Sequence, residues 1–331
     1  MERKGILLYS GGLDSLLAAK LLLDQGIELL GLYCILPFVP PDIDPKTLEA
    51  AEMAAQIDLP LVYHRLGKDY LDIIKDPPHG YGKEMNPCID CKIHFMKKAA
   101  QLMRAENAAF VATGEVVGQR PMSQLKNTMR HIEKASGLQD HLLRPLSAKL
   151  LPPTRAEREG IVNRDLLLDI NGRGRKRQMA LAEEYGITLY TSPAGGCFFT
   201  DPNIAKRVQD LVQNHPGFNP TDVYLLTTGR HLRMNPSAKI IISRNSGEND
   251  VLEHYRDNAD YFIIPAFTGP LAHVTGTLDE STMKLAAELV ARYGKTEKGT
   301  CSIEIFGQDG KSHTVECTEP AHDTLIDTMR I

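Results

Sequence analysis

The chain has 331 residues and a formal net charge of −4, which excludes a protein that attracts nucleic acid through an overall basic field. Its length favours two domains, each large enough to bury a core. No apolar run is long enough for a membrane span, and the run in MERKGILLYSGG is too short for a signal peptide. We therefore expect a cytoplasmic protein with no membrane segment. Its six cysteines are not expected to form a disulfide framework, and the close pair Cys88 and Cys91 favours metal binding or redox chemistry.

Short apolar runs alternate with helical patterns up to about residue 145. The apolar runs are KGILLYS, IELLGLYCILPF, LPLVYHRL and AAFVATGE, and the helical patterns include LDSLLAAKLLLDQG and PKTLEAAEMAAQI. This alternation predicts an α/β fold, a parallel sheet flanked by helices. Ligands of such sheets bind beyond the carboxyl ends of the strands, so we expect the chemistry in the loops that follow strands.

The pattern changes beyond about residue 150, where LLPPT breaks it. A basic helical stretch, a turn in SPAGGC and a helix in DPNIAKRVQDLVQNHPG follow. Strand-like runs come next (DVYLLTTG, AKIIISR, YFIIP), then a helix in ESTMKLAAELVARYG and a hairpin in CSIEIFGQDGKSHTVEC. The sequence thus predicts a first domain over residues 1–200 and a second, smaller α+β domain over residues 201–331.

A serine- and glycine-rich turn joins the first predicted strand to the first helix in LLYSGGLDSLLAAK. Two glycines let the backbone approach an anion, and the amides at the helix start point toward it. The turn lacks both the Walker pattern with its lysine and the G-x-G-x-x-G of dinucleotide folds. A plainer alternative is a serine-capped turn in which Asp14 complements the helix dipole.

Ser-Gly-Gly-x-Asp-Ser directly after a first strand resembles the pyrophosphatase loop, or PP-loop, of the N-type ATP pyrophosphatases. The resemblance implies an adenine nucleotide alpha hydrolase-like fold that cleaves ATP to AMP and pyrophosphate. AMP is placed on a substrate oxygen, which becomes a leaving group. The residues that the resemblance assigns to the pyrophosphate part of ATP and to Mg²⁺ are Ser10, Gly11, Gly12, Asp14 and Ser15, with Asp14 also as a catalytic candidate.

A second loop, VATGEVVGQRPMSQ over residues 111–124, follows the fourth strand-like run. Its Thr-Gly-Glu, Gly-Gln and Ser-Gln series resembles a loop of tRNA 4-thiouridine synthetases. The plainer alternative is a turn followed by a capped helix. The resemblance makes Gly114, Glu115 and Gln119 candidates for binding ATP, and Gln124 a weaker one.

Two cysteine motifs accompany these loops. NPCIDC, with Cys88 and Cys91, resembles the cysteine loop of tRNA 2-thiouridylases, in which an acidic residue commonly stands at the position of Cys88. PAGGCFFT, with Cys197, resembles the Gly-x-Cys-Phe loop that carries their second essential cysteine. Together the three match PP-loop thiolases that hold a [4Fe-4S] cluster by three thiolates and leave one iron open, so all three are candidate metal ligands and catalytic residues.

Other uses of these sulfur atoms remain open. Cys88, Cys91 and Cys197 with His94 would also satisfy a tetrahedral zinc site. A persulfide route would use Cys91 or Cys197, with a helix start lowering a thiol pKa. A buried pair plus an unrelated thiol is the plainest alternative.

The three remaining cysteines are not expected at the site. Cys34 lies in an apolar strand, which indicates core packing. Cys301 and Cys317 fall near opposite ends of the predicted hairpin, and we expect them to face each other as free thiols.

Two basic regions are candidates for contacts with RNA phosphates. NGRGRKRQ over residues 171–178 either neutralises phosphates or forms a solvated face; its candidates are Arg173, Arg175, Lys176 and Arg177. The string GRHLRMNPSAKIIISRNSGEND resembles the RNA-binding domain of NFACT proteins. The candidates there are Arg230, His231 and Arg233, together with Gly229, Lys239 and Arg244.

These resemblances favour an ATP-dependent tRNA sulfurtransferase, which adenylates a nucleobase carbonyl, that of uridine or cytidine, and replaces its oxygen by sulfur. Its expected partners are tRNA and a sulfur donor, either sulfide or a sulfur-carrier protein, and a homodimer is compatible with the chain. Two alternatives come from other classes. One is a PP-loop adenylating ligase or amidotransferase, and the other is a non-catalytic RNA-binding protein with a retained nucleotide fold.

Overall fold

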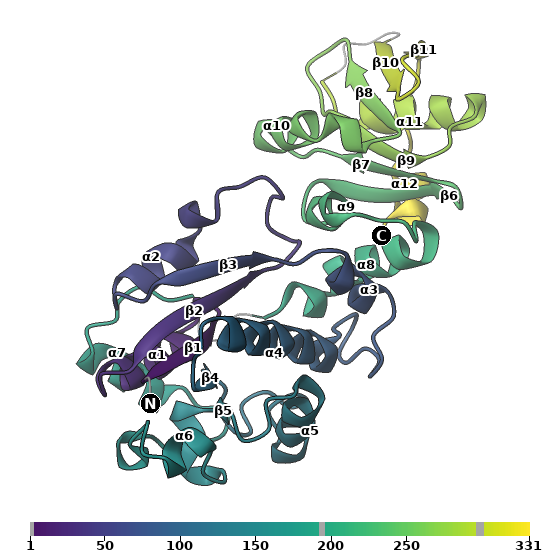
Figure 1. Cartoon of the computed structure of the whole chain (residues 1–331). Helices are drawn as coiled ribbons and strands as arrows, with labels where there is room; N and C mark the ends of the chain where they lie inside the picture. The colour runs from purple at the N-terminus through teal and green to yellow at the C-terminus, as the bar shows by residue number, and fades with distance from the viewer. Residues whose placement is uncertain (1–2, 192–195, 296–300) are drawn as a thin grey trace. The chain divides into compact units, whose positions relative to one another are not determined.

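The computed structural model describes residues 3–191, 196–295 and 301–331. The chain forms two compact units, Met1–Cys197 and Phe198–Ile331 (Figure 1). The division lies close to the boundary expected at residue 200, and most of the predicted SPAGGC turn, residues 192–195, lies outside the described residues. None of the described helices is long and apolar enough to cross a membrane.

The first unit is built on a parallel five-stranded sheet with the order β3-β2-β1-β4-β5. All of its strand pairs are parallel, which confirms the predicted α/β fold. The strands are β1 (Lys4–Tyr9), β2 (Glu28–Ile35), β3 (Leu61–Arg65), β4 (Phe110–Thr113) and β5 (Leu142–Leu143). β1 is central, so the turn that follows it lies in the middle of the carboxyl edge of the sheet.

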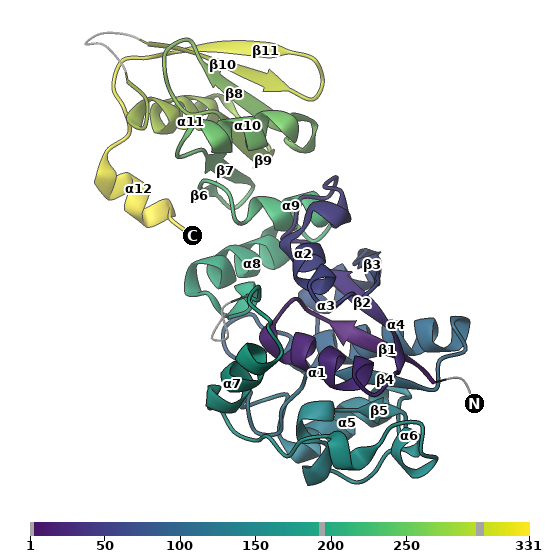
Figure 2. The same ribbon diagram turned by 90° about the vertical axis from the view of Figure 1, so that its left-hand side faces the viewer.

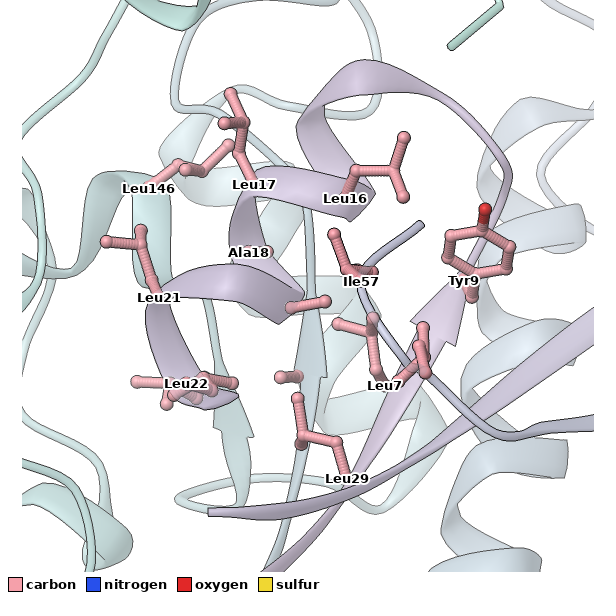
Figure 3. Close-up of a cluster of buried hydrophobic side chains, with 14 of the residues drawn as sticks. Leu7, Tyr9, Leu16, Leu17, Ala18, Leu21, Leu22, Leu29, Ile57 and Leu146 are labelled. Carbon is pink, nitrogen blue, oxygen red and sulfur yellow. The ribbon is translucent and has the colours of Figure 1, made fainter. Parts of the chain in front are cut away.

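Helices cover both faces of this sheet. Successive side chains of a strand point to opposite faces, and the apolar side chains of β1 are buried on both. Leu7 of β1 packs into one apolar cluster with α1 (Leu13–Leu23), whose leucines are buried on nearly every side (Figure 3). Ile6 packs into the other, against α4 (Cys88–Ala105) and α5 (Lys126–Ser136). The other helices of this unit are α2 (Glu49–Ala55), α3 (Lys68–Lys75), α6 (Arg155–Arg158) and α7 (Lys176–Glu184), with short 3-10 turns at Pro45–Thr47, Pro145–Leu150 and Arg164–Leu166.

The second unit is an α+β domain with a six-stranded sheet in the order β11-β10-β8-β9-β7-β6 (Figure 2). Every pair in it is antiparallel. Its strands are β6 (Arg230–Asn235), β7 (Ala238–Ile242), β8 (Tyr261–Pro265), β9 (Ala272–Gly276), β10 (Cys301–Gly307) and β11 (Ser312–Cys317). Its helices are α8 (Pro202–Asn214), α9 (Pro220–Leu225), α10 (Ser246–His254), α11 (Glu280–Arg292) and α12 (Asp323–Met329), with 3-10 turns at Phe198–Thr200 and Arg256–Asn258.

One predicted strand of this unit is wrong, because DVYLLTTG lies in and after helix α9. Asn219 caps that helix, Pro220 occupies its first turn, and Asn219 and Asp222 form a capping box. These local start signals outweigh the strand-like apolar run. The predicted hairpin is confirmed, and Cys301 pairs directly opposite Cys317 as free thiols.

Candidate ATP and cysteine site

The PP-loop motif forms a tight turn between β1 and α1. Gly11 has a φ of 73°, a left-handed conformation that favours glycine. The hydroxyl of Ser15 donates to the carbonyl of Gly12 over 2.7 Å, and Ser10 Oγ lies 3.2 Å from Ser15 Oγ. Gly12 is the N-cap of α1 and offers no side-chain cap, so the alternative of a serine-capped turn is wrong. Ser15 N and Leu16 N donate to the carbonyl of Gly12, whereas the amides of Leu13 and Asp14 have no partner among the described residues and are open to an anion.

Asp14 lies at the centre of a polar network. Gln119 Nε2 donates to Asp14 Oδ2 over 2.6 Å, and Arg175 Nη2 lies 3.7 Å from the same oxygen. Gln178 Nε2 donates in turn to Gln119 Oε1 over 3.2 Å. Three buried atoms of this network, Asp14 Oδ1, Arg175 Nη1 and Gln178 Oε1, have no hydrogen-bond partner among the described residues. Buried polar atoms are costly to leave unpaired, so this network is suited to a polar ligand.

The loop after β4 makes a backbone contact with the first turn of α1. A Cβ atom on Gly114 would lie 2.5 Å from the backbone carbonyl of Asp14 and from Ser15 N. Only glycine fits this approach. Because β4 pairs with β1 in parallel, the loop follows at the same edge of the sheet, as the sequence predicted.

Glu115 is buried in an ion-pair network rather than turned toward open space. Its Oε1 pairs with Lys92, and its Oε2 accepts from Arg144 Nε over 3.0 Å; Arg144 also pairs with Glu133. Burial opposes the charge of Glu115, but Lys92 and Arg144 outweigh it and lower the pKa of the carboxyl to about 2. Both oxygens of Glu115 are therefore occupied by protein groups.

The two cysteines of NPCIDC lie in the first turn of α4, where Cys88 is half-buried and Cys91 is buried. Burial raises the pKa of Cys91, although a 3.0 Å contact with Tyr70 Oη opposes this rise. Electrostatic interactions with Cys197 and Cys88 add to the increase. The expectation that a helix start lowers the pKa of Cys91 is wrong, because desolvation dominates.

No group of three or more His, Cys, Asp or Glu side chains is placed to hold a metal ion among the described residues. His94, the fourth ligand of the zinc alternative, has its Nε2 3.6 Å from Asp69 Oδ2 and its ring beside Tyr70. Burial lowers the pKa of His94. Cys34 lies in β2, and burial raises its pKa to about 12, as expected for a core thiol.

A chain of one carboxylate and two imidazoles adjoins the cysteine turn and was not predicted. Asp90, which is buried, accepts from the backbone N–H of His79 over 2.9 Å and lies 2.6 Å from its Nδ1. His79 Nε2 lies 2.8 Å from His131 Nε2. In the sequence, only the position of Asp90 between Cys88 and Cys91 hints at a polar contact here, because His79 and His131 lie outside the motif. The contacts clamp the loop before α4 to the turn that carries Cys88 and Cys91.

The four basic candidates of the first unit separate into two groups. Arg173 and Lys176 are exposed, and the exposed Arg177 pairs with Asp169 over 2.8 Å. Arg175 instead turns toward Asp14 of the PP-loop. The structure thus brings one predicted RNA contact into the polar network around Asp14.

The candidates of the second unit are mostly engaged within it. Arg230 donates to the carbonyl of Ser243 over 2.8 Å. His231 is 1% exposed, and burial lowers its pKa well below the usual value. Arg233 forms a two-pronged contact with the buried Asp210, at 2.8 and 2.6 Å.

A parallel sheet whose central strand leads into Ser-Gly-Gly-x-Asp-Ser at an uncapped helix start is similar to the PP-loop domains of ATP pyrophosphatases. Residues 1–149 match the family model described as thiamine biosynthesis protein (ThiI). Residues 229–329 match the model of the NFACT protein RNA binding domain. These matches confirm the two resemblances seen in the sequence, one to a PP-loop domain and one to the NFACT RNA-binding domain.

Curated relatives agree with this assignment. The tRNA-specific 2-thiouridylase MnmA of Acidithiobacillus ferrooxidans is 26% identical over 217 residues, which cover 63% of this chain and 58% of the relative. MnmA of Clostridium acetobutylicum is 32% identical over 130 residues, 34% of this chain and 36% of the relative. The chain thus spans less than two thirds of the length of these relatives. Among solved structures, a 4-thiouridine synthetase in complex with RNA and ATP is 18% identical and covers 67% of this chain and 53% of that chain, with a TM-score of 0.38.

Proposed function

We propose that this chain is an ATP-dependent enzyme of tRNA thiolation, which adenylates a nucleobase carbonyl and replaces its oxygen by sulfur. The observation that carries the proposal is that the loop at Gly114 and Glu115 contacts both the PP-loop and α4, the helix that carries Cys88 and Cys91. Gly114 contacts the backbone of Asp14, and Glu115 pairs with Lys92, the residue after Cys91. An adenylating site and two thiols are thereby attached to one loop. The relatives, which are named tRNA thiouridylases, support tRNA as the substrate.

The residues at the PP-loop fit ATP and Mg²⁺. The open amides of α1 suit the pyrophosphate part of ATP, and Ser10 and Ser15 add hydroxyl groups at the same turn. Asp14 Oδ1 is buried and has no hydrogen-bond partner in the part of the chain that the structure describes, and a carboxylate oxygen is a ligand that Mg²⁺ prefers. Arg175 adds a fixed positive charge next to Asp14, where phosphate charge would gather.

The proposed reaction has two steps. The nucleobase carbonyl oxygen attacks the α-phosphorus of ATP, the bond to the bridging oxygen of the β-phosphate breaks, and pyrophosphate leaves. A sulfur nucleophile then attacks the activated carbon, and AMP leaves with the former carbonyl oxygen. The first step needs anion binding at α1, and the second needs a sulfur atom near the same carbon.

We further propose that Cys88, Cys91 and Cys197 hold a [4Fe-4S] cluster. Support comes from Cys88 and Cys91, which lie in one turn of α4, and from the resemblance of the loop that carries Cys197 to the second cysteine loop of tRNA 2-thiouridylases. Cys91 is buried, Cys88 is half-buried and Cys197 is exposed. A cationic centre would stabilise the thiolate form of the buried Cys91. When bound, such a cluster supplies a coordinated sulfur atom. Tyr70 and the clamp at Asp90 would hold the cysteine turn in place.

Anaerobic purification followed by assays of iron and acid-labile sulfide tests the cluster. We expect about four iron atoms and four sulfides per chain in the wild type, as in any cluster of this type, and a large loss of both in Cys197→Ala. Zinc without iron after anaerobic reconstitution would contradict the cluster and favour the zinc alternative. Pyrophosphate release that depends on tRNA, and that Asp14→Asn abolishes, tests the adenylation step separately.

A further inference from the structure

A cavity of about 440 Å³ in the second unit is lined by basic side chains from four separate segments. Lys206 and Arg207 come from α8, Arg230 from the start of β6, and Arg244 follows β7. Arg330, after α12, completes the set. The only acidic side chain in the lining is that of Asp327.

Three of these cations have no acidic partner. Arg244 pairs with Glu248, and Arg330 lies 3.2 Å from Asp327. Lys206, Arg207 and Arg230 form no ion pair with any residue that the structure describes. Burial and the charge of Arg244 lower the pKa of Arg207, as expected where positive charge is not neutralised. The cavity therefore has an excess of positive charge.

The two central guanidinium groups are held in place by carbonyl oxygens. Arg207 Nη1 donates to Leu226 O over 2.6 Å, while its buried Nε finds no hydrogen-bond partner within residues 3–191, 196–295 and 301–331. Arg230 Nη1 donates to Ser243 O over 2.8 Å, and its guanidinium lies 4.3 Å from the ring centre of Tyr293. Because carbonyls hold them without neutralising them, these cations lose little freedom when they bind an anion.

We propose that this cavity binds a backbone phosphate of RNA, and that Lys206 and Arg207 of α8 belong to the RNA-binding surface. The proposal rests on the proposed function, because it takes tRNA as the ligand. Arginine groups in fixed positions match the oxygens of a phosphate. The cavity is many times the roughly 30 Å³ of one water molecule, so it has room for a phosphate with part of its sugar. Lys206 and Arg207 lie before the 229–329 segment that matches the RNA-binding model, so neither the motif nor the model points to them.

The test measures binding of fluorescently labelled tRNA to the full chain over a range of KCl concentrations. Lys206→Gln and Arg207→Gln should each weaken binding several-fold and reduce the slope of log K against log salt by roughly 0.7 to 0.9, the value for one lost phosphate contact. Lys284→Gln, an equal charge change at an exposed position of α11, should leave the slope unchanged. Arg207→Lys, which keeps the charge, should keep the slope, and thermal melting checks that each variant folds.

Three outcomes separate this inference from the proposed function. If the variants bind tRNA with the wild-type slope, the phosphate cavity is overturned while tRNA binding stands. If inorganic phosphate binds to wild type but not to Arg207→Gln, and does not compete with tRNA, the cavity takes a free anion and the RNA proposal is overturned. If the slope depends on Lys206 and Arg207 but tRNA gains no sulfur, the cavity is supported and the proposed catalysis fails.

Discussion

The ammonium group of Lys92 is paired with the buried carboxylate of Glu115. Lys92 follows Cys91 in α4, and Glu115 follows Gly114, which contacts the backbone of Asp14. One ion pair thus connects the segment that carries two thiols to the loop that supports the nucleotide turn.

Removing the charge of Glu115 should destabilise the first unit. Glu115→Gln leaves Lys92 without its partner and Arg144 with Glu133 alone, so we expect a loss of about 3 kcal/mol in the free energy of unfolding, typical of a broken buried ion pair. Urea unfolding of the full chain measures it. Glu184→Gln, an exposed position of α7, is the control and should change stability by less than about 0.5 kcal/mol.

The same carboxyl predicts how stability depends on pH. The pKa of Glu115 falls from 4.5 to about 2 on folding, so its contribution is complete above about pH 4.5 and is lost as the pH falls toward 2. A shift of this size corresponds to about 3 kcal/mol. Unfolding measured between pH 5 and pH 2 should be less pH-dependent in Glu115→Gln than in the wild type. Parallel curves for the two proteins would contradict the assigned role.

A methyl group at Gly114 should disturb the nucleotide turn. In Gly114→Ala the new Cβ would lie 2.5 Å from the Asp14 carbonyl, so the loop and α1 must separate, at a cost of about 1 to 3 kcal/mol. We expect at least a tenfold weaker binding of ATP, measured by calorimetry. Gly174→Ala is a matched control, because a Cβ there meets no atom within 4 Å. Equal ATP affinity in both variants would show that the close approach is unimportant.

Arg175 and Arg177 should have separable effects, although they stand two positions apart. Arg175→Gln removes the charge beside Asp14, and we expect about a tenfold rise in the KM for ATP, or about 1.4 kcal/mol. Arg177→Gln removes an exposed pair with Asp169 and should change that KM less than twofold. If Arg177→Gln had the larger effect on ATP, our assignment of Arg175 to the nucleotide network would be wrong.

The clamp at Asp90 should control access to Cys91. Asp90→Ala removes both contacts with His79, so the turn that carries the buried thiol should loosen. Anaerobic alkylation of the metal-free protein, with modified peptides quantified by mass spectrometry, should show several-fold faster labelling of Cys91. Asp72→Ala, at an exposed position of α3, is the control. Unchanged labelling in Asp90→Ala would mean that Tyr70 and burial alone protect the thiol.

Much of the fold was predictable, because its signals are local. The runs that became β1 to β4 are strongly apolar, and the turn after β1 has a specific motif. The strand predicted in DVYLLTTG failed because the capping residues Asn219 and Pro220 stand just before it. The strand β5 was missed because it has only two residues, Leu142–Leu143, too few to show a strand pattern. Its pairing with β4 becomes visible only in the folded sheet.

The motifs of the proposed site can be seen in the sequence, but the contacts that connect them cannot. The PP-loop and the cysteine turn are continuous in sequence, so their residue types identified them. Arg144 and His79 reach Glu115 and Asp90 from distant segments, and no sequence pattern marks such contacts. Arg175 was assigned to RNA because it stands in a basic run, and only its 3.7 Å separation from Asp14 relates it to ATP.

The most direct test of the account is mass spectrometry of nucleosides from tRNA incubated anaerobically with the reconstituted protein, ATP, Mg²⁺ and ³⁴S-labelled sulfide. We predict a thionucleoside that carries the label, requires ATP, and is absent with Asp14→Asn and with Cys197→Ala. Release of pyrophosphate without any labelled nucleoside, or a labelled nucleoside that still forms with Asp14→Asn, would contradict it.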